Sequence, residues 1–176
     1  MNTKKTEAGF TYVDVLIAMV ILLIGCTALV GAIAGMVIRT KSQEKQLMAK
    51  QYATSTLESI ISARDISVLG WDAVGNVGSN IVDGTPRGVF LVGEKPLRDG
   101  AGIDQIVGTS DDTSTVVTGF TRQITITDIC DPTRPSANCS PAGPYPVMLR
   151  RVDVTIYYFS EKLKQQETVS TILSKY

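Results

Sequence analysis

The sequence predicts an α+β protein, in which the second half of a long N-terminal α-helix packs on a small antiparallel β-sheet head. Three observations support this. The residues from Val15 to Ile38 form an apolar run without a charged side chain. The residues from 39 to 64 are polar but keep apolar residues at helical spacing, and short β-like runs separated by glycine and proline follow. In this fold each element buries the apolar face of the other.

The apolar run is long enough to cross a membrane. As a helix with a rise of about 1.5 Å per residue it spans roughly 36 Å, more than the roughly 30 Å of a bilayer core. A buried helix of a soluble protein is the alternative, but such helices rarely run so far without a charge. The sequence RTKSQEKQ after Ile38 lacks the small-residue cleavage site of a secretory signal peptide, so we expect the span to persist.

The helix is expected to continue beyond the apolar run. No proline precedes Pro86, and apolar residues at spacings of three and four follow Arg39, so we predict one helix from Phe10 to about Arg64. The apolar positions expected to face the head are Leu47, Met48, Ala53, Leu57, Ile60 and Ile61.

The rest of the chain reads as a strand-rich head. Glycines, Asn and Asp mark residues 70–88 as loop, with Trp71 as a core or helix-end anchor. Strands are predicted at 89–93, 116–129, 147–159 and 168–173, with a polar hairpin connection at 160–167. In the third strand one face is expected to carry Val152, Val154, Ile156 and Tyr158.

Composition argues against several function classes. Lysine plus arginine equals aspartate plus glutamate, 17 each, so no overall field favours nucleic acid, and no basic patch with interleaved aromatic residues occurs. The absence of histidine removes Ser-His-Asp and Cys-His catalysis. No nucleophile elbow or compelling carboxylate pair is present either, so we do not expect an enzyme.

Two of the three cysteines are close in sequence. Cys130 and Cys139 flank a proline-rich loop, and a disulfide between them suits an oxidising compartment; two free thiols are the alternative. Cys26 lies inside the apolar run and cannot easily meet them.

The start of the apolar run contains an acid. In GFTYVDVLIAMVILLIG, residues 9–25, Asp14 follows a short leader that carries Lys4 and Lys5. A carboxylate in hydrocarbon is costly and is therefore a functional candidate. This stretch resembles the N-terminal processing motif of type IV prepilins and of the related type II secretion pseudopilins. The resemblance is strong over residues 4–38 and only architectural beyond.

The resemblance implies a set of site residues. A prepilin peptidase and methyltransferase would remove residues 1–9 by cutting between Gly9 and Phe10 and would methylate the new amine of Phe10. Asp14 would then pair with the amine of a neighbouring subunit, although the family usually has glutamate there. A carboxylate and an ammonium satisfy each other in low dielectric. An aspartate solvated by lipid headgroups is the alternative.

The resemblance also implies domains and partners. Residues 10–38 would form the transmembrane and assembly half of the helix, 39–66 its amphipathic half, and 67–176 the head. Gly31 and Gly35 form a GxxxG spacing that allows close helix contact, unless they only reflect the abundance of glycine in membrane helices. The partners would be other pilin or pseudopilin subunits, the peptidase, the inner-membrane assembly platform and membrane lipid.

We therefore expect a minor pilin of a type IV pilus-like filament. The head would lie in the periplasm before assembly, and afterwards in a cell-surface pilus (fimbrium) or a periplasmic pseudopilus of the cell envelope. A positive-inside count of the residues around the helix favours the opposite orientation, whereas the leader and the cysteine pair favour this one. Alternatives are a minor pseudopilin of a type II secretion system and, in a different class, a membrane-anchored extracytoplasmic ligand-binding module, which would require neither the cut site nor Asp14.

One acidic loop is a candidate cation site. The stretch DGAGIDQIVGTSDD contributes Asp99, Asp104, Asp111 and Asp112, and oxygen-rich flexible loops suit calcium. Some pseudopilins carry calcium in a comparable loop. The spacing does not match an EF-hand, and a solvated acidic turn is the alternative. We expect no other cofactor.

Overall fold

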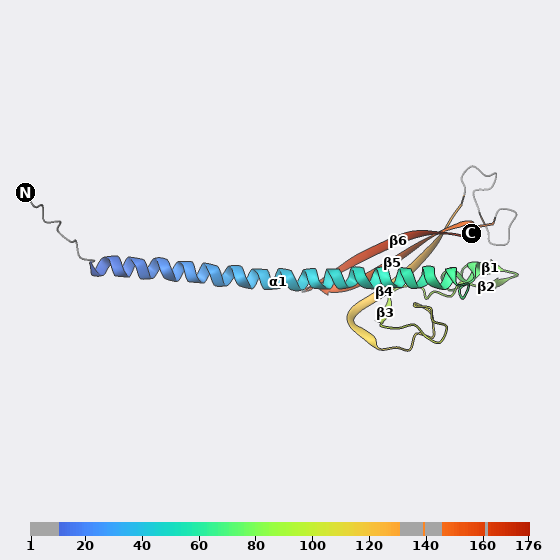
Figure 1. Ribbon diagram of the computed structural model, residues 1–176, viewed down its shortest axis with the longest axis horizontal. Coiled ribbons are helices and arrows are strands. Elements are labelled where there is room, and N and C mark those ends of the chain that lie inside the picture. The colour runs from blue at the N-terminus through green and yellow to red at the C-terminus, as the bar shows by residue number, and fades with distance from the viewer. Residues whose placement is uncertain (1–10, 131–138, 140–145, 161) are drawn as a thin grey trace, which may run out of the picture. The chain divides into compact units, whose positions relative to one another are not determined.

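The computed structural model describes residues 11–130, 139, 146–160 and 162–176. The chain divides into two compact units, Met1–Gln43 and Glu44–Tyr176. Helix α1 (Tyr12–Asp65) runs through both (Figure 1). The second unit, the head, adds the 3-10 helix η1 (Trp71–Ala73) and, among the described residues, the strands β1 (Ile81–Val82), β2 (Thr85–Pro86), β3 (Lys95–Arg98), β4 (Val116–Ile129), β5 (Leu149–Ser160) and β6 (Leu163–Ser174).

The first unit consists, in its described part, of the N-terminal portion of α1. Helix formation follows from a sequence rich in Leu, Ala, Met and Ile with no proline. Every described residue up to Lys41 is exposed. The predicted helix is therefore present, with its first helical residue at Tyr12 and its last at Asp65.

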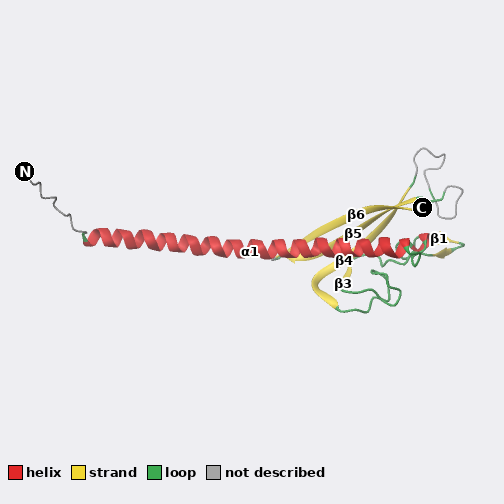
Figure 2. Cartoon of the chain, in the orientation of Figure 1, coloured by secondary structure: helices red, strands yellow, loops and turns green. Residues whose placement is uncertain are grey.

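The head is built on an antiparallel sheet with the strand order β3-β4-β5-β6 (Figure 2). Strand β4 has the predicted bounds 116–129, and β5 pairs with it from Leu149 opposite Ile129 to Tyr158 opposite Phe120. Burial alternates along β5, and the predicted face of Val152, Val154, Ile156 and Tyr158 is buried. One face of the sheet therefore covers the core, and the other is polar.

The core lies between the sheet and the C-terminal part of α1. The helix contributes a stripe of buried residues at spacings of three and four: Ala49, Ala53, Thr56, Leu57, Ile60 and Ala63. The prediction that Leu47 and Met48 face the head is wrong, since these residues are 59% and 39% exposed. They lie off this stripe, and the neighbouring Lys45 and Gln46 are instead hydrogen-bonded to Phe159 and Glu167.

The segment between α1 and β3 is more structured than predicted. Residues 70–88 were expected to be loop, but they hold η1 and the hairpin β1–β2. Asp83 and Gly84 turn this hairpin with φ values of 50° and 75°, which suit a type I′ turn.

The prediction of a strand at residues 89–93 is wrong, since these residues form no strand. Phe90 makes only an isolated bridge to Asn76, and its N–H donates to the Gly75 carbonyl at 3.0 Å. The next N–H, that of Leu91, donates to the Gly108 carbonyl at 2.9 Å. The backbone is thus satisfied by neighbouring loops, and the edge strand β3 begins at Lys95.

The polar hairpin connection at 160–167 is also shorter than predicted. Strand β6 begins at Leu163 and pairs with β5 along its whole length. Polar residues are tolerated there because this end of β6 is exposed and bonds to the helix, as in the 2.8 Å hydrogen bond from Gln46 to Glu167.

Candidate functional site

The first helical turn of α1 holds the predicted assembly acid. Asp14 Oδ2 accepts hydrogen bonds from the N–H of Thr11 at 3.0 Å and from its hydroxyl at 2.7 Å. The Asp14 N–H in turn faces Thr11 Oγ1 at 3.4 Å. This reciprocal arrangement is a capping box, which satisfies the free N–H groups at a helix start. The predicted cut site, Gly9 and Phe10, lies outside the described residues.

The helix surface after Asp14 is apolar and uncovered. Helix α1 is long and apolar enough to span a membrane, and none of its most apolar stretch is buried within the protein. Apart from the helix's own adjacent backbone and neighbouring residues, no atom lies within 4 Å of the positions that Cβ atoms would take at Gly31 and Gly35, so the GxxxG face is open. Cys26 is exposed on the same helix. Exposed apolar surface of this extent needs lipid or another protein to cover it.

The two cysteines of the head are joined. Cys130 and Cys139 form a disulfide with Cα atoms 5.5 Å apart. Cys130 directly follows Ile129, the last residue of β4.

The four acidic residues predicted as calcium ligands do not form a metal cluster. Within the described ranges there is no group of three or more His, Cys, Asp or Glu side chains that could hold a metal ion. Asp111 accepts hydrogen bonds from the Thr109 hydroxyl at 2.6 Å and the Asp104 N–H at 3.1 Å, which hold the pKa of Asp111 below its usual value. The carboxylates of Asp104, Asp111 and Asp112 accept hydrogen bonds from the loop's own backbone, so this geometry gives the calcium hypothesis no support.

Asp112 belongs to a different arrangement, a buried ion pair. Its Oδ2 is 2.9 Å from Nη2 of Arg122 and accepts the Gly108 N–H at 2.8 Å. The two side chains are 5% (Arg122) and 7% (Asp112) exposed. Burial lowers the pKa of Arg122, and the charge and hydrogen bond of Asp112 oppose that shift.

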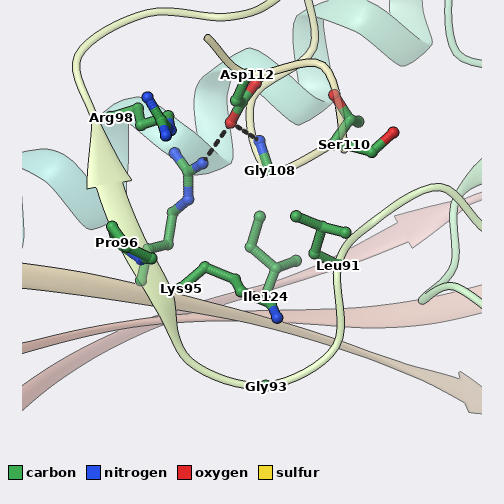
Figure 3. Close-up of a pocket in the computed structure, with 11 residues that line it drawn as sticks. Leu91, Gly93, Lys95, Pro96, Arg98, Gly108, Ser110, Asp112 and Ile124 are labelled. Atoms are coloured by element: carbon green, nitrogen blue, oxygen red, sulfur yellow. Dashed lines mark hydrogen bonds and ion pairs between the residues drawn. The ribbon is translucent and has the colours of Figure 1, made fainter. Parts of the chain in front are cut away.

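This ion pair lies in the wall of a cavity of about 230 Å³ in the head. Figure 3 shows Arg98 and Asp112 on one side and Leu91 and Ile124 on the other. The full lining consists of Leu91, Gly93, Lys95, Pro96, Arg98, Gly108, Thr109, Ser110, Asp112, Arg122 and Ile124. Sequence reasoning missed this site. The one available signal was Arg122 in the same alternating register as Ile124 and Ile126, where a core residue is expected.

Comparison of the sequence with protein-family models and with curated proteins found no match, and comparison with solved structures found none either.

Proposed function

We propose that this chain is a structural subunit, a minor pilin, of a type IV pilus-like filament. It would be processed by a prepilin peptidase and assembled through its N-terminal helix. The observation that carries the proposal is the uncovered apolar surface of α1, beginning directly after Asp14. The long helix and antiparallel sheet of the head are consistent with a pilin-like α+β fold.

The apolar surface suits two successive environments. In a membrane, lipid chains would cover it; in a filament, the helices of neighbouring subunits would. The open face around Gly31 and Gly35 permits close approach of a second helix. A helix that served only as a soluble core element would instead have this surface buried by its own chain.

The geometry of Asp14 supports a role in pairing. Both hydrogen bonds that described residues make to its carboxylate go to Oδ2. Among these residues none bonds to Oδ1, which could accept a donor from another chain, and the amine on Phe10 of a neighbouring subunit is the donor that the motif implies. Until that amine arrives, the hydrogen bonds from Thr11 would partly satisfy the carboxylate, because an unpaired carboxylate in hydrocarbon is unfavourable.

The disulfide supports a head on the oxidising side of the membrane. Disulfides persist in the periplasm and outside the cell and are rare in the cytosol, and the head contains the Cys130–Cys139 bond. The mechanism that follows is passive. The processed subunit waits in the inner membrane, and the assembly platform moves it into a helical fibre that apolar helix contacts and the Asp14–amine pair stabilise.

The experiment is an intact-mass and N-terminal analysis of the protein from its native membrane, in cells with an active prepilin peptidase. We expect the chain to lack residues 1–9 and to begin with monomethylated phenylalanine. Gly9→Leu is the matched control and should retain the leader. A native protein that begins at Met1 would overturn the proposal.

A membrane-anchored ligand-binding module is the second candidate, favoured by the cation-lined cavity of the head. A simple tether requires no leader cut, so the same mass measurement separates it from the filament subunit. A minor pseudopilin of a type II secretion system shares the proposed architecture. Immunogold labelling distinguishes the two machines, since a pilus would carry the label at the cell surface and a pseudopilus in the periplasm.

A further inference from the structure

We propose that the cavity between β3, β4 and the 108–112 loop binds an oxyanion, a phosphoryl or carboxylate group. This inference concerns the head alone and does not rest on the filament role of the helix.

The charge of the cavity lining is unbalanced. Lys95 and Arg98 come from β3 and Arg122 from β4, whereas Asp112 is the one acidic residue among the lining side chains. The chain as a whole has equal numbers of acidic and basic residues. The excess of positive charge is therefore a local property of this cavity.

The strand register places two of these cations opposite each other. Lys95 and Arg122 are partners across β3 and β4. Like charges directly opposite on a sheet are destabilising. An anion that lay between the two side chains would remove this repulsion. The acidic residue of the lining, Asp112, pairs with Arg122 and not with Lys95.

The cations retain unused hydrogen-bond donors. Of the Arg122 guanidinium, only Nη2 has a hydrogen-bond partner among the described residues, although the side chain is 95% buried. Arg98 donates through Nη1 to the Ser114 carbonyl, and Lys95 Nζ has no partner in the described part of the chain. Guanidinium and ammonium donors with free N–H groups bind oxyanions by charge-assisted hydrogen bonds.

Asp112 does not offer an alternative ligand for these donors. Its Oδ2 is already occupied by Gly108 and Arg122, as the dashed lines in Figure 3 show. Its Oδ1 is inaccessible to solvent and has no hydrogen-bond partner. Asp112 therefore orients Arg122, while Lys95 and the remaining donors of Arg98 and Arg122 are available to a ligand.

The volume limits the size of the ligand. Sites for drug-sized ligands occupy about 300–1,000 Å³, and this cavity has about 230 Å³. An anionic group with a small carrier, such as one sugar unit, suits that volume. Leu91, Pro96 and Ile124 supply an apolar wall for the carbon atoms of the carrier.

The test is calorimetric titration of the full chain in dodecyl maltoside, in chloride buffer of constant ionic strength, with sodium phosphate as the probe. We expect saturable binding with one phosphate per chain. The variant K95Q/R98Q should bind at least about tenfold more weakly, a loss of about 1.4 kcal/mol. The control R87Q/K162Q removes the same charge from exposed positions that do not line the cavity and should bind like the native protein. Unchanged binding in K95Q/R98Q, or an equal loss in the control, would overturn the proposal.

Arg122 needs a variant that keeps the fold. Arg122→Gln alone leaves a buried carboxylate unpaired, so a loss of binding in that variant would not be separable from a loss of folding. The double variant D112N/R122Q, with a neutral pair, is therefore used. Its near-ultraviolet circular dichroism should match that of the native protein while phosphate binding is lost. A folded D112N/R122Q protein that binds phosphate with native affinity contradicts the assignment.

Two further probes identify the source of the group. Glucose 6-phosphate and glucuronate are titrated under the same conditions as inorganic phosphate. If glucose 6-phosphate or glucuronate binds more tightly than inorganic phosphate, the natural ligand is an anionic group carried on a larger molecule. If both bind equally or more weakly, the natural ligand is a free ion. The absence of saturable binding for all three probes overturns the proposal.

Discussion

The side-chain amide of Asn76 takes the place of a neighbouring strand beside Ile126. Its Oδ1 accepts the Ile126 N–H at 2.9 Å, and its Nδ2 donates to the Ile124 carbonyl at 2.8 Å. Strand β3 pairs with β4 only as far as Arg122, so the edge of β4 beyond this point would otherwise be open. Unpaired strand edges and buried backbone groups without partners are both unfavourable.

Replacing Asn76 by alanine should lower the free energy of unfolding by about 2 kcal/mol, because a partly buried N–H and carbonyl of β4 both lose their partner. Asn76→Asp is the matched variant: it keeps an acceptor for Ile126 but sets a carboxylate oxygen against the Ile124 carbonyl, and should be at least as destabilising as alanine. Urea unfolding of the full chain in detergent measures both. Equal stability of the alanine variant and the native protein would show that the contact has no structural role.

Arg150 is a fully buried cation that joins three parts of the head. Its Nε is 2.9 Å from Asp128 Oδ1, its Nη1 donates to the carbonyls of Trp71 and Val74, and its guanidinium lies 4.5 Å from the centre of the Trp71 ring. Trp71 in turn donates to the Val147 carbonyl at 3.0 Å. This cluster attaches the segment after α1 to β4 and β5, and it gives Trp71 the anchoring role that the sequence predicted.

Arg150→Ala should therefore lower the free energy of unfolding by about 3 kcal/mol, since removal of one partner leaves buried acceptors unsatisfied. The adjacent Arg151 is 56% exposed and pairs with Asp153 on the sheet surface. Arg151→Ala should cost less than about 1 kcal/mol, because exposed ion pairs contribute little. Chemical denaturation of the two variants side by side makes the comparison, and similar losses would refute the burial argument.

The disulfide should stabilise the head by restricting the unfolded chain. For cysteines nine residues apart, loop closure predicts a loss of about 2.5 kcal/mol in C130S/C139S. Cys26→Ser changes an exposed thiol on the apolar helix and should leave stability unchanged. Thermal unfolding with and without reductant tests this, and a native protein indifferent to reductant would contradict it.

The helix α1 and the strands β4 and β5 could be predicted because each depends on a pattern of neighbouring residues. The buried face of β5 follows from strict alternation over many residues, which only one register satisfies. The bounds of β4 follow from a run rich in Val, Ile and Thr. The apolar stripe of α1 was found as well, but periodicity does not show where along the helix the head begins. Leu47 and Met48 were for that reason placed in a core that begins at Ala49.

The features that the sequence did not reveal depend on contacts between distant segments. Arg150 occupies a core position among valines, and its burial is possible only because Asp128 and two carbonyls of the segment after α1 meet it. The cavity combines residues 95–98, 108–112 and 122–124, which lie in three separate segments. The strand predicted at 89–93 failed because the partners of Phe90 and Leu91 are loops, which strand propensity does not describe.

Acid should weaken the head partly through Glu94. Lys164 at 2.5 Å, and next the Thr121 hydroxyl, lower the pKa of Glu94. A carboxyl with a lower pKa in the folded state contributes stability above its unfolded value, near 4.5, and loses it as the pH falls through the folded pKa. Glu94→Gln should flatten the fall of unfolding free energy between about pH 5 and pH 3, and Lys164→Gln should flatten it in part, since Thr121 still bonds Glu94. The double variant should match Glu94→Gln. Single variants that retain the native acid profile would contradict this pairing.

Asp14 caps the start of α1 and, in the proposed filament, would also pair with a neighbouring amine; variants of Thr11 and Asp14 separate the two roles. As a capping residue it needs Thr11, whose N–H and hydroxyl bind its Oδ2. As the partner of a neighbouring amine it needs only its charge. If the proposed assembly role is correct, Asp14→Asn should abolish incorporation into filaments, because a neutral amide cannot offset an ammonium in low dielectric. Thr11→Val, which keeps the carboxylate and removes a cap worth about 1 kcal/mol, should retain incorporation. Immunoblots of sheared filaments and of membranes provide the measurement. Equal defects in the two variants would assign Asp14 to the helix start alone.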